Sequence, residues 1–512
     1  MQRDSSTFVA VLIVAVACAA HAALFGFVSP DSWYYVQLAR SLRLGEGCSV
    51  EGHYFAVFPC GYPGALALLT PSTDFATIIL SSKLVNAGML LASFACLRAF
   101  VGVGWVAAFI VIAPATLLNA TYTWSENLFL LSTSLVLLLI KRLDRSPGIP
   151  GVALLALALL VGVSSRYYFA PYAFALWVGV LLLYGRRTAL WSLPAFVVAA
   201  AGYVAYSWFN KTLTGFATGT ERYAPAESLS FLISHFLWKI GTLDLFSTLA
   251  VLATLLLLAR RALQWQPIPQ AVRGASRELR LIVWAGSAFL LLAFILRLQA
   301  QYQLFNTRTI GPGLVLLVAG LAGMVVRVAP GKKVPAVAIV TAGLLSLLIA
   351  HWPTVRTEVR TVMAGHYRSV PRLIEDYAGR FKDRPYDTIV PFSIPAVSPF
   401  ISFNAELYYG SGAKFINPLT NPGANADTEM TLSARLAHFP EGTCGIDFTP
   451  YETRAQLQEI LDSTYDLDYS VRVDTGQVER KKMRVFDAGL AQYVLDRFVP
   501  GVVVDCREMF PK

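Results

Sequence analysis

Long apolar stretches alternate with short basic connectors over the first 352 residues of the chain. The first stretch, Phe8–Val28, contains His21 as its only ionisable residue. A membrane-spanning helix needs roughly 20 apolar residues, so we predict a retained span here rather than a cleaved signal peptide. The same pattern predicts further spans at roughly 76–98, 101–118, 126–141, 150–164, 168–184, 189–208, 243–260, 281–297, 310–327 and 334–352. The predicted fold is a polytopic α-helical membrane protein with about 11 transmembrane helices.

The connectors predict the orientation of these spans. Basic residues gather in every second connector: Arg98, then Lys141, Arg142 and Arg145, then Arg186 and Arg187, then 260–280, then Arg327, Lys332 and Lys333. Connectors rich in Lys and Arg stay in the cytoplasm, which also places the N-terminus there. The segments 29–75, 119–126, 209–242, 297–309 and 353–512 are then expected to face outside.

The composition excludes several classes of protein. The 512 residues are 55% hydrophobic and only 14% charged, whereas soluble proteins carry about 25% charged residues. This excludes an ordinary soluble enzyme, a disordered chain and a small disulfide-bonded module. Of the net charge of +10, residues 1–352 hold 24 basic and 11 acidic groups, and residues 353–512 hold 18 and 21. The positive excess therefore belongs to the membrane connectors, and no compact basic patch predicts a nucleic-acid partner.

The charge density divides the chain into a transmembrane domain, 1–352, with the outer loop 29–75, and a soluble periplasmic domain, 353–512. The second domain is expected to be a small α/β domain. We predict helices at Ser369–Lys382, 452–463 and 488–498. Strands are predicted at Thr388–Phe392, Lys414–Ile416 and Val502–Cys506.

The six cysteines fit this topology. Cys18 and Cys96 lie in apolar stretches, whereas the other four fall on the expected outer, oxidising side, as Cys48 with Cys60 and Cys444 with Cys506. Two disulfides are one interpretation and four unpaired thiols are the other, because connectivity cannot be read from sequence. The chain has no CxxC motif, so we expect no metal or redox site of that kind.

An aspartate follows the first predicted span. Asp31 comes directly before an expected surface helix, Ser32–Leu44, whose apolar residues include Trp33 and Tyr34. One interpretation is a helix cap, which contributes about 1 kcal/mol. The other is a functional carboxylate at the membrane boundary, where a lipid headgroup and a polar acceptor meet.

Several motifs share this order with a known family. Asp31, the loop helix and the run FPCGYPGALALL are followed by TYTWSENLFLL, with Ser125 and Glu126, and VGVSSRYYFAPY, with Arg166 and Tyr167. Next come WFNKTLTGFATGTERY and FNTRTIGPGLVLL; they contain Asn210, Gly215, Thr218, Gly219, Arg222, Arg308 and Pro312. Over roughly residues 8–330 the chain resembles the GT-C glycosyltransferases, in particular bacterial relatives of protein mannosyltransferases and of aminoarabinose and arabinofuranosyl transferases. The segment 353–512 carries no such match.

The resemblance implies a bacterial inner-membrane enzyme that transfers a sugar, with inversion, from a polyprenyl-phosphate carrier to a hydroxyl of a glycan, lipid or protein. Asp31 is the expected general base, a role that contributes typically about 10²–10⁴-fold. Cations favour the leaving phosphate. The substrate-binding and phosphate-binding candidates are Arg308, Arg166, Lys211, Arg222, Glu126, His53, Tyr34 and Tyr167.

This sequence departs from the family at two positions. Ser32 stands where many relatives carry a second acid after the aspartate, and Thr309 follows Arg308 where an aromatic residue is usual. The first departure weakens the case for a metal site. No cofactor is therefore predicted, and a divalent cation is left open.

Simpler roles exist for most of these residues. Arg166 suits a snorkelling position, Lys211 and Arg222 suit a solvated loop, Glu126 suits a helix N-terminus, and His53 suits a structural role. A transporter or lipid flippase is the alternative function, although it predicts broken or charged helices near the membrane centre and an internal repeat. A non-catalytic assembly partner is the third.

Overall fold

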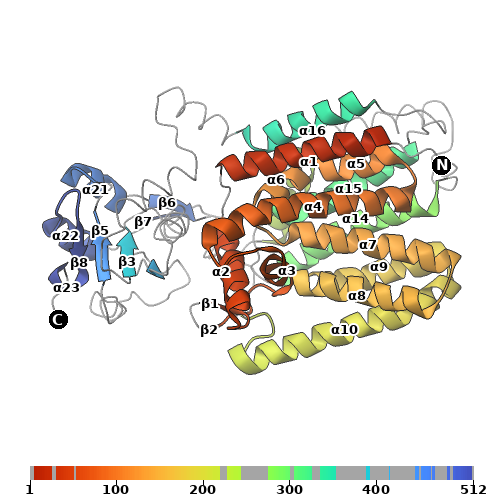
Figure 1. Cartoon of the computed structure of the whole chain (residues 1–512), viewed down its shortest axis with the longest axis horizontal. Coiled ribbons are helices and arrows are strands. Elements are labelled where there is room, and N and C mark those ends of the chain that lie inside the picture. The colour runs from red at the N-terminus through yellow and green to blue at the C-terminus, as the bar shows by residue number, and fades with distance from the viewer. Residues whose placement is uncertain are drawn as a thin grey trace.

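The structure of the protein is a computed structural model. It describes residues 5–25, 30–50, 53–219, 228–243, 275–299, 305–325, 335–352, 388–391, 414–415, 444–448, 451–462, 464–467, 481–484 and 488–509. Most of the described chain is a bundle of helices that run side by side (Figure 1). These helices are α1 (Ser5–Phe25), α4 (Phe75–Val101), α5 (Gly104–Ile112), α6 (Pro114–Thr121), α7 (Glu126–Arg145), α8 (Ile149–Ser165), α9 (Phe169–Tyr184), α10 (Arg186–Thr214), α14 (Arg277–Gln299), α15 (Thr307–Val325) and α16 (Ala336–Ala350).

The bundle contains helices that can cross a membrane. Among the described residues α1, α4, α10, α14 and α15 are long and apolar enough to do so, and α5 with α6 counts as a sixth if the bent pair is one span. The helices α8, α9 and α16 are apolar but shorter. The predicted polytopic helical fold is therefore confirmed, while the predicted span at 243–260 lies, apart from Leu243, outside the described residues.

One predicted span is not continuous. Most of the stretch 101–118 lies in α5 and α6, which meet at Ala113 with a bend of 52°. Pro114 is the first residue of α6. Proline has no N–H to donate to the preceding turn and it clashes with the carbonyl four residues earlier, so α5 ends where the proline begins a new helix.

Small residues allow the closest helix contacts. Gly286 of α14 lies against the backbone of α15, where an added Cβ would come 2.7 Å from the Gly313 oxygen and overlap the Leu317 nitrogen. Such close approach gains van der Waals contact, which is a main source of helix association in a membrane.

The connection 29–75 is folded against one end of the bundle (Figure 1). It contains α2 (Pro30–Leu44), the two-residue strands β1 (Ser49–Val50) and β2 (His53–Tyr54), and α3 (Gly61–Leu69). Arg43 of α2 donates to the Ala67 carbonyl of α3 at 2.9 Å. A disulfide joins Cys48 to Cys60 across the hairpin, whereas Cys18 and Cys96 are free. The surface helix expected at Ser32–Leu44 is present and begins at Pro30.

The segment 209–242, which the sequence predicts as an outer loop, is helical in part. It contains the helix α11 (Leu229–Thr242), which Ser228 caps by accepting from the Phe231 N–H at 3.3 Å. Leu232 of α11 is buried against Leu290 and Phe305. Packing of its apolar face against these two residues stabilises the helix.

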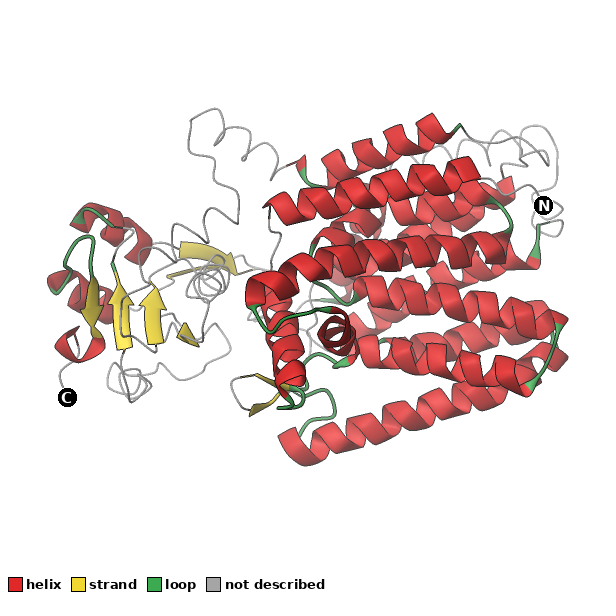
Figure 2. Cartoon of the chain, in the orientation of Figure 1, coloured by secondary structure: helices red, strands yellow, loops and turns green. Residues whose placement is uncertain are grey.

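The last part of the chain contains a four-stranded mixed sheet in the order β4 (Lys414–Phe415), β3 (Thr388–Pro391), β5 (Cys444–Asp447) and β8 (Val503–Asp505). Figure 2 shows this sheet beside short helices, which are α21 (Arg454–Leu461), α22 (Ala488–Asp496) and α23 (Cys506–Met509). A separate hairpin joins β6 (Thr464–Leu467) to β7 (Lys481–Arg484). The predicted helix Ser369–Lys382 lies outside the described residues.

The sheet brings the last two cysteine positions close together. The antiparallel register pairs Gly445 with Asp505, so the backbone places Cys444 and Cys506 at the same end of neighbouring strands. Cys506 is disulfide-bonded.

Candidate functional site

Four predicted site residues meet at the end of the bundle that carries α2. Asp31 lies in the first turn of α2, Glu126 is the first residue of α7, Arg166 follows α8, and Arg308 lies in the first turn of α15. Arg308 donates through Nη1 to Asp31 Oδ2 and through Nε to Glu126 Oε1. Arg166 Nη1 donates to the same Glu126 oxygen at 2.7 Å. Two carboxylates and two guanidinium groups thus form one continuous ionic cluster, which we call the Asp31 cluster.

Glu126 lies at the back of this cluster. Its side chain is 2% exposed, whereas those of Asp31 and Arg166 are each 29% exposed. Glu126 Oε1 accepts from both arginines, and its Oε2 is buried and has no hydrogen-bond partner among the described residues. Glu126 therefore holds the arginines, while Asp31 and Arg166 present the accessible surface.

Local structure fixes the position of Arg308. The Asn306 side chain accepts hydrogen bonds from the backbone N–H groups of Arg308 and Thr309, at 2.9 and 3.0 Å, and so caps α15. The guanidinium lies 4.5 Å from the centre of the Trp124 ring, a cation–π contact. The arginine is thereby preorganised before any ligand binds.

Some donors of the two arginines remain unused. The hydrogen bonds of the two side chains use Arg166 Nη1, Arg308 Nε and Arg308 Nη1. Arg166 Nε and Nη2 and Arg308 Nη2 donate to none of the described residues. Arginine forks suit phosphate because their N–H groups match two oxygens at once. The Asp31 cluster can therefore bind an anion through these donors, while Asp31 provides a partly exposed carboxylate.

Tyr35 links α2 to the turn before α7. Its hydroxyl lies 2.9 Å from Ser125 Oγ. Burial, with the nearby Glu126 charge, raises the pKa of Tyr35 to about 12, so the phenol stays protonated at neutral pH. The neighbouring candidate Tyr34 instead stacks on Phe55, with ring centres 4.9 Å apart.

A second group of predicted residues forms a hydrogen-bond network outside the Asp31 cluster. The Asn210 amide accepts from the Tyr54 hydroxyl at 2.6 Å and donates to the Tyr167 hydroxyl at 2.8 Å. Tyr167 in turn donates to the Ala56 carbonyl at 2.5 Å, and burial raises its pKa. Gly219 packs against the same Ala56 backbone with φ +74°. These contacts attach the end of α10 to the loop that follows β2.

The remaining candidates do not join the Asp31 cluster among the described residues. Lys211 is exposed in the last turn of α10 and forms no ion pair there. Arg222 lies outside the described residues. His53 belongs to β2, where its backbone pairs with Val50, and its side chain is not described.

Sequence reasoning missed the polar residues that support the turn before Glu126. Lys83 of α4 is 1% exposed and donates to the Thr121 carbonyl at 2.8 Å and to Thr123 Oγ1 at 3.2 Å. Asn86 donates to the carbonyls of Ala120 and Tyr122, at 3.0 and 2.7 Å. A lysine and an asparagine inside the predicted span 76–98 are the signal that could have identified them, because buried polar groups in a span need partners.

The Asp31 cluster does not fit a divalent cation. Arg308 contacts both Asp31 and Glu126, and Arg166 contacts Glu126, so two guanidinium groups already balance the two carboxylates. Within the described ranges no three metal-ligating side chains of His, Cys, Asp or Glu gather.

Comparison with known proteins identifies the fold. No protein-family model and no curated protein sequence matches the chain. The solved structures that resemble it include ArnT from Cupriavidus metallidurans bound to undecaprenyl phosphate and the same protein in the apo state. Their TM-scores are 0.53 and 0.51, with 13% and 12% sequence identity over 90% of this chain and 96% and 95% of theirs. The chain therefore has the GT-C fold of ArnT, as the sequence motifs predicted.

Proposed function

We propose that this protein is a membrane glycosyltransferase that uses a polyprenyl-phosphate-linked sugar, with Asp31 as its general base. The observation that carries the proposal is the Asp31 cluster, where an accessible carboxylate and two arginines meet at one end of a GT-C fold. The similar ArnT structure with bound undecaprenyl phosphate supports a lipid phosphate as the donor group.

In the proposed reaction, the acceptor hydroxyl attacks the anomeric carbon of the sugar. A new carbon–oxygen bond forms to the acceptor, the bond to the phosphate oxygen breaks with inversion, and polyprenyl phosphate leaves. Asp31 accepts the hydroxyl proton. Arg166 and the unused Nη2 of Arg308 bind the phosphate oxygens, where negative charge develops.

Glu126 would keep the two arginines in place during this step. Without it, two neighbouring guanidinium groups would repel each other at the mouth of the site. Because Glu126 is buried behind them, its proposed role is positioning rather than contact with substrate.

The topology proposed with this function has about 11 spans in the bacterial inner membrane and a cytoplasmic N-terminus. The Asp31 cluster and a soluble domain, 353–512, would face the periplasm. Figure 1 supports this arrangement, because the described strands and helices of the last part lie beyond the same bundle end as α2 and α3. The proposed acceptor is a cell-envelope glycan, lipid or protein.

The test is to incubate purified protein with a panel of polyprenyl-phosphate sugars and to measure release of free polyprenyl phosphate. We expect Asp31→Asn to lower turnover about 100-fold or more while donor binding stays near that of wild type. Asp74→Asn is the matched control, because Asp74 caps α4 by accepting from the Thr77 N–H at 2.8 Å and asparagine caps equally well. Wild-type turnover by Asp31→Asn would remove Asp31 from the mechanism.

A transporter or flippase is the second candidate, and the bent pair α5–α6 is the observation in its favour. Broken helices form substrate sites in many transporters. In proteoliposomes a transporter would move lipid-linked sugar across the membrane without releasing polyprenyl phosphate. That outcome would overturn the glycosyltransferase proposal.

A further inference from the structure

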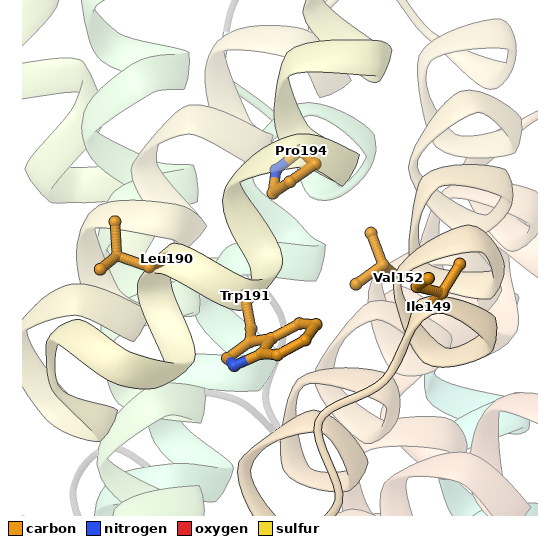
Figure 3. Close-up of a pocket in the computed structure, with 5 residues that line it drawn as sticks. All are labelled: Ile149, Val152, Leu190, Trp191 and Pro194. Atoms are coloured by element: carbon orange, nitrogen blue, oxygen red, sulfur yellow. The ribbon is translucent and has the colours of Figure 1, made fainter.

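An apolar groove lies between the beginnings of α8 and α10. It has a volume of about 350 Å³ and is lined by Ile149, Val152, Leu190, Trp191 and Pro194. In Figure 3 the Trp191 ring projects from α10 toward Ile149 and Val152 of α8. All five side chains are hydrophobic, so burial of an apolar ligand in the groove is favoured by the hydrophobic effect.

The groove opens to the outside of the bundle. Ile149 is 80% exposed, Leu190 64% and Trp191 40%. In a membrane-spanning bundle such residues face lipid, and a tryptophan near the end of a span is typical of the membrane–water interface.

The groove lies at the opposite end of the bundle from the Asp31 cluster. The helix α8 starts at Ile149 and runs to Ser165, which directly precedes Arg166 of the cluster. The helix α10 starts at Arg186 and ends at Thr214. In its last part Asn210 accepts a hydrogen bond from Tyr54 of β2. The groove is therefore separate from the candidate active site and belongs to the other leaflet.

Two exposed arginines, Arg186 and Arg187, lie one turn from the lining residues of the groove, and a third, Arg145, precedes Ile149 in the chain. Arg186 and Arg187 each precede a lining residue by four positions, Leu190 and Trp191 respectively, so each lies one turn below it on the same face of α10. Arg145 ends α7, four residues before Ile149. Among the described residues none of these arginines forms an ion pair.

The two acidic residues of this end, Asp144 and Glu278, have other partners, and Glu278 lies 3.3 Å from Lys141 Nζ. Asp144 accepts from the Thr188 hydroxyl at 2.6 Å and lies 3.9 Å from Arg277 Nη1. The border is therefore left positive next to a hydrophobic groove. This combination matches a molecule with an apolar chain and an anionic head.

We propose that this groove binds one anionic diacyl phospholipid of the inner leaflet. An acyl chain would lie against Trp191, Ile149 and Val152, and the phosphate would bind the guanidinium groups of Arg186 and Arg187, which suit phosphate oxygens. Pro194 contributes because its compact ring leaves room beside Trp191 where a longer side chain would fill it. The proposal does not depend on the proposed glycosyltransferase activity.

Native mass spectrometry of the full-length protein in detergent tests this lipid site. The protein is titrated with phosphatidylglycerol and, separately, with phosphatidylcholine of the same acyl chains. We expect one retained phosphatidylglycerol and at least fivefold weaker retention of phosphatidylcholine. Equal retention of both lipids would overturn the proposal, because the arginines would then play no part.

Two variants test the two halves of the site. Arg186→Gln with Arg187→Gln, and separately Trp191→Ala, should each lower phosphatidylglycerol retention at least fivefold. The matched controls are Arg98→Gln with Arg142→Gln, which remove two charges at the same end of the bundle, and Trp208→Ala, an exposed tryptophan at the other end of α10. Wild-type retention in both groove variants would contradict the proposal.

A competition experiment distinguishes this site from the donor site. Undecaprenyl phosphate should not displace the retained phosphatidylglycerol, and Asp31→Asn should not alter its retention. Displacement by undecaprenyl phosphate would show that the groove belongs to a polyprenyl-phosphate site, and the phospholipid proposal would fail. Failure of the glycosyltransferase assay would leave this result unchanged.

Discussion

Arg308 and Asp31 lie 277 residues apart in the chain and form an ion pair at one end of the helical bundle. Each is in the first turn of its helix, so the contact depends on how α2 and α15 are packed. The same arginine binds Glu126, which makes it the link between the accessible carboxylate and the buried one.

Glu126→Gln should destabilise the protein. The substitution removes the buried negative charge that pairs with Arg166 and Arg308, and loss of one partner from a buried ion pair costs about 3–5 kcal/mol. Thermal unfolding in detergent measures the effect. Asp496→Asn is the control, because its partner Arg454 and Asp496 itself are more than half exposed and such pairs contribute about 0–1 kcal/mol. Equal shifts in both variants would contradict this role for Glu126.

Arg308→Lys should impair donor use while keeping the charge. Lysine is a point charge and cannot bind Glu126 through Nε, bind Asp31 through Nη1 and lie over Trp124 at the same time. We expect kcat/KM for the lipid-linked sugar to fall at least about tenfold, equivalent to about 1.4 kcal/mol. Arg277→Lys is the control, since Arg277 is 56% exposed and lies 3.9 Å from Asp144. Unchanged kcat/KM in Arg308→Lys would show that only the charge matters.

Gly219→Ala should disturb the loop after α10 more than Gly215→Ala does. Both glycines have positive φ, +74° and +81°, but only at Gly219 would a Cβ overlap the Ala56 backbone. The Gly215 variant should lose about 1–2 kcal/mol from backbone strain, and the Gly219 variant should lose more because the loop must also move. Thermal unfolding compares the two, and a smaller loss at Gly219 would contradict the close contact.

Loss of the Cys48–Cys60 disulfide should loosen the connection between α2 and α3. The two cysteines are 12 residues apart, and a crosslink that closes a loop of this length contributes about 3 kcal/mol in the chain-entropy model. Cys48→Ser with Cys60→Ser should therefore lower the unfolding temperature, whereas Cys96→Ala, at a free cysteine, should not. Limited proteolysis should cut the connection sooner in the double variant, and unchanged proteolysis would argue against this role.

Local sequence was enough to predict most of the helices. A span is recognised from its own residues, because the bilayer demands about 20 apolar positions whatever the neighbours are. The predicted helix at Ser32–Leu44 and the strands near Thr388, Lys414 and Val502 also have close counterparts. The broken span at Ala113 was not expected, although Pro114 carried the signal.

Side-chain partners were not predictable in the same way. The motifs predict substrate binding for Glu126, yet the fold places it behind two arginines, and no motif points to Lys83 or Tyr35. Lys211 shares a motif with Asn210, but only the asparagine belongs to the hydrogen-bond network beside β2. Neighbouring residues on a helix point in different directions, so a motif alone does not say which of them faces the site.

The sequence by itself determined the class of protein, a basic polytopic membrane chain with an aspartate just after its first span. The tertiary structure decided which charges meet: Asp31, Glu126, Arg166 and Arg308 come from separate helix ends and connections. The physical reason is one of range. Membrane insertion and helix formation depend on neighbouring residues in the chain, whereas an ionic contact depends on helix packing that brings distant residues within a few ångströms.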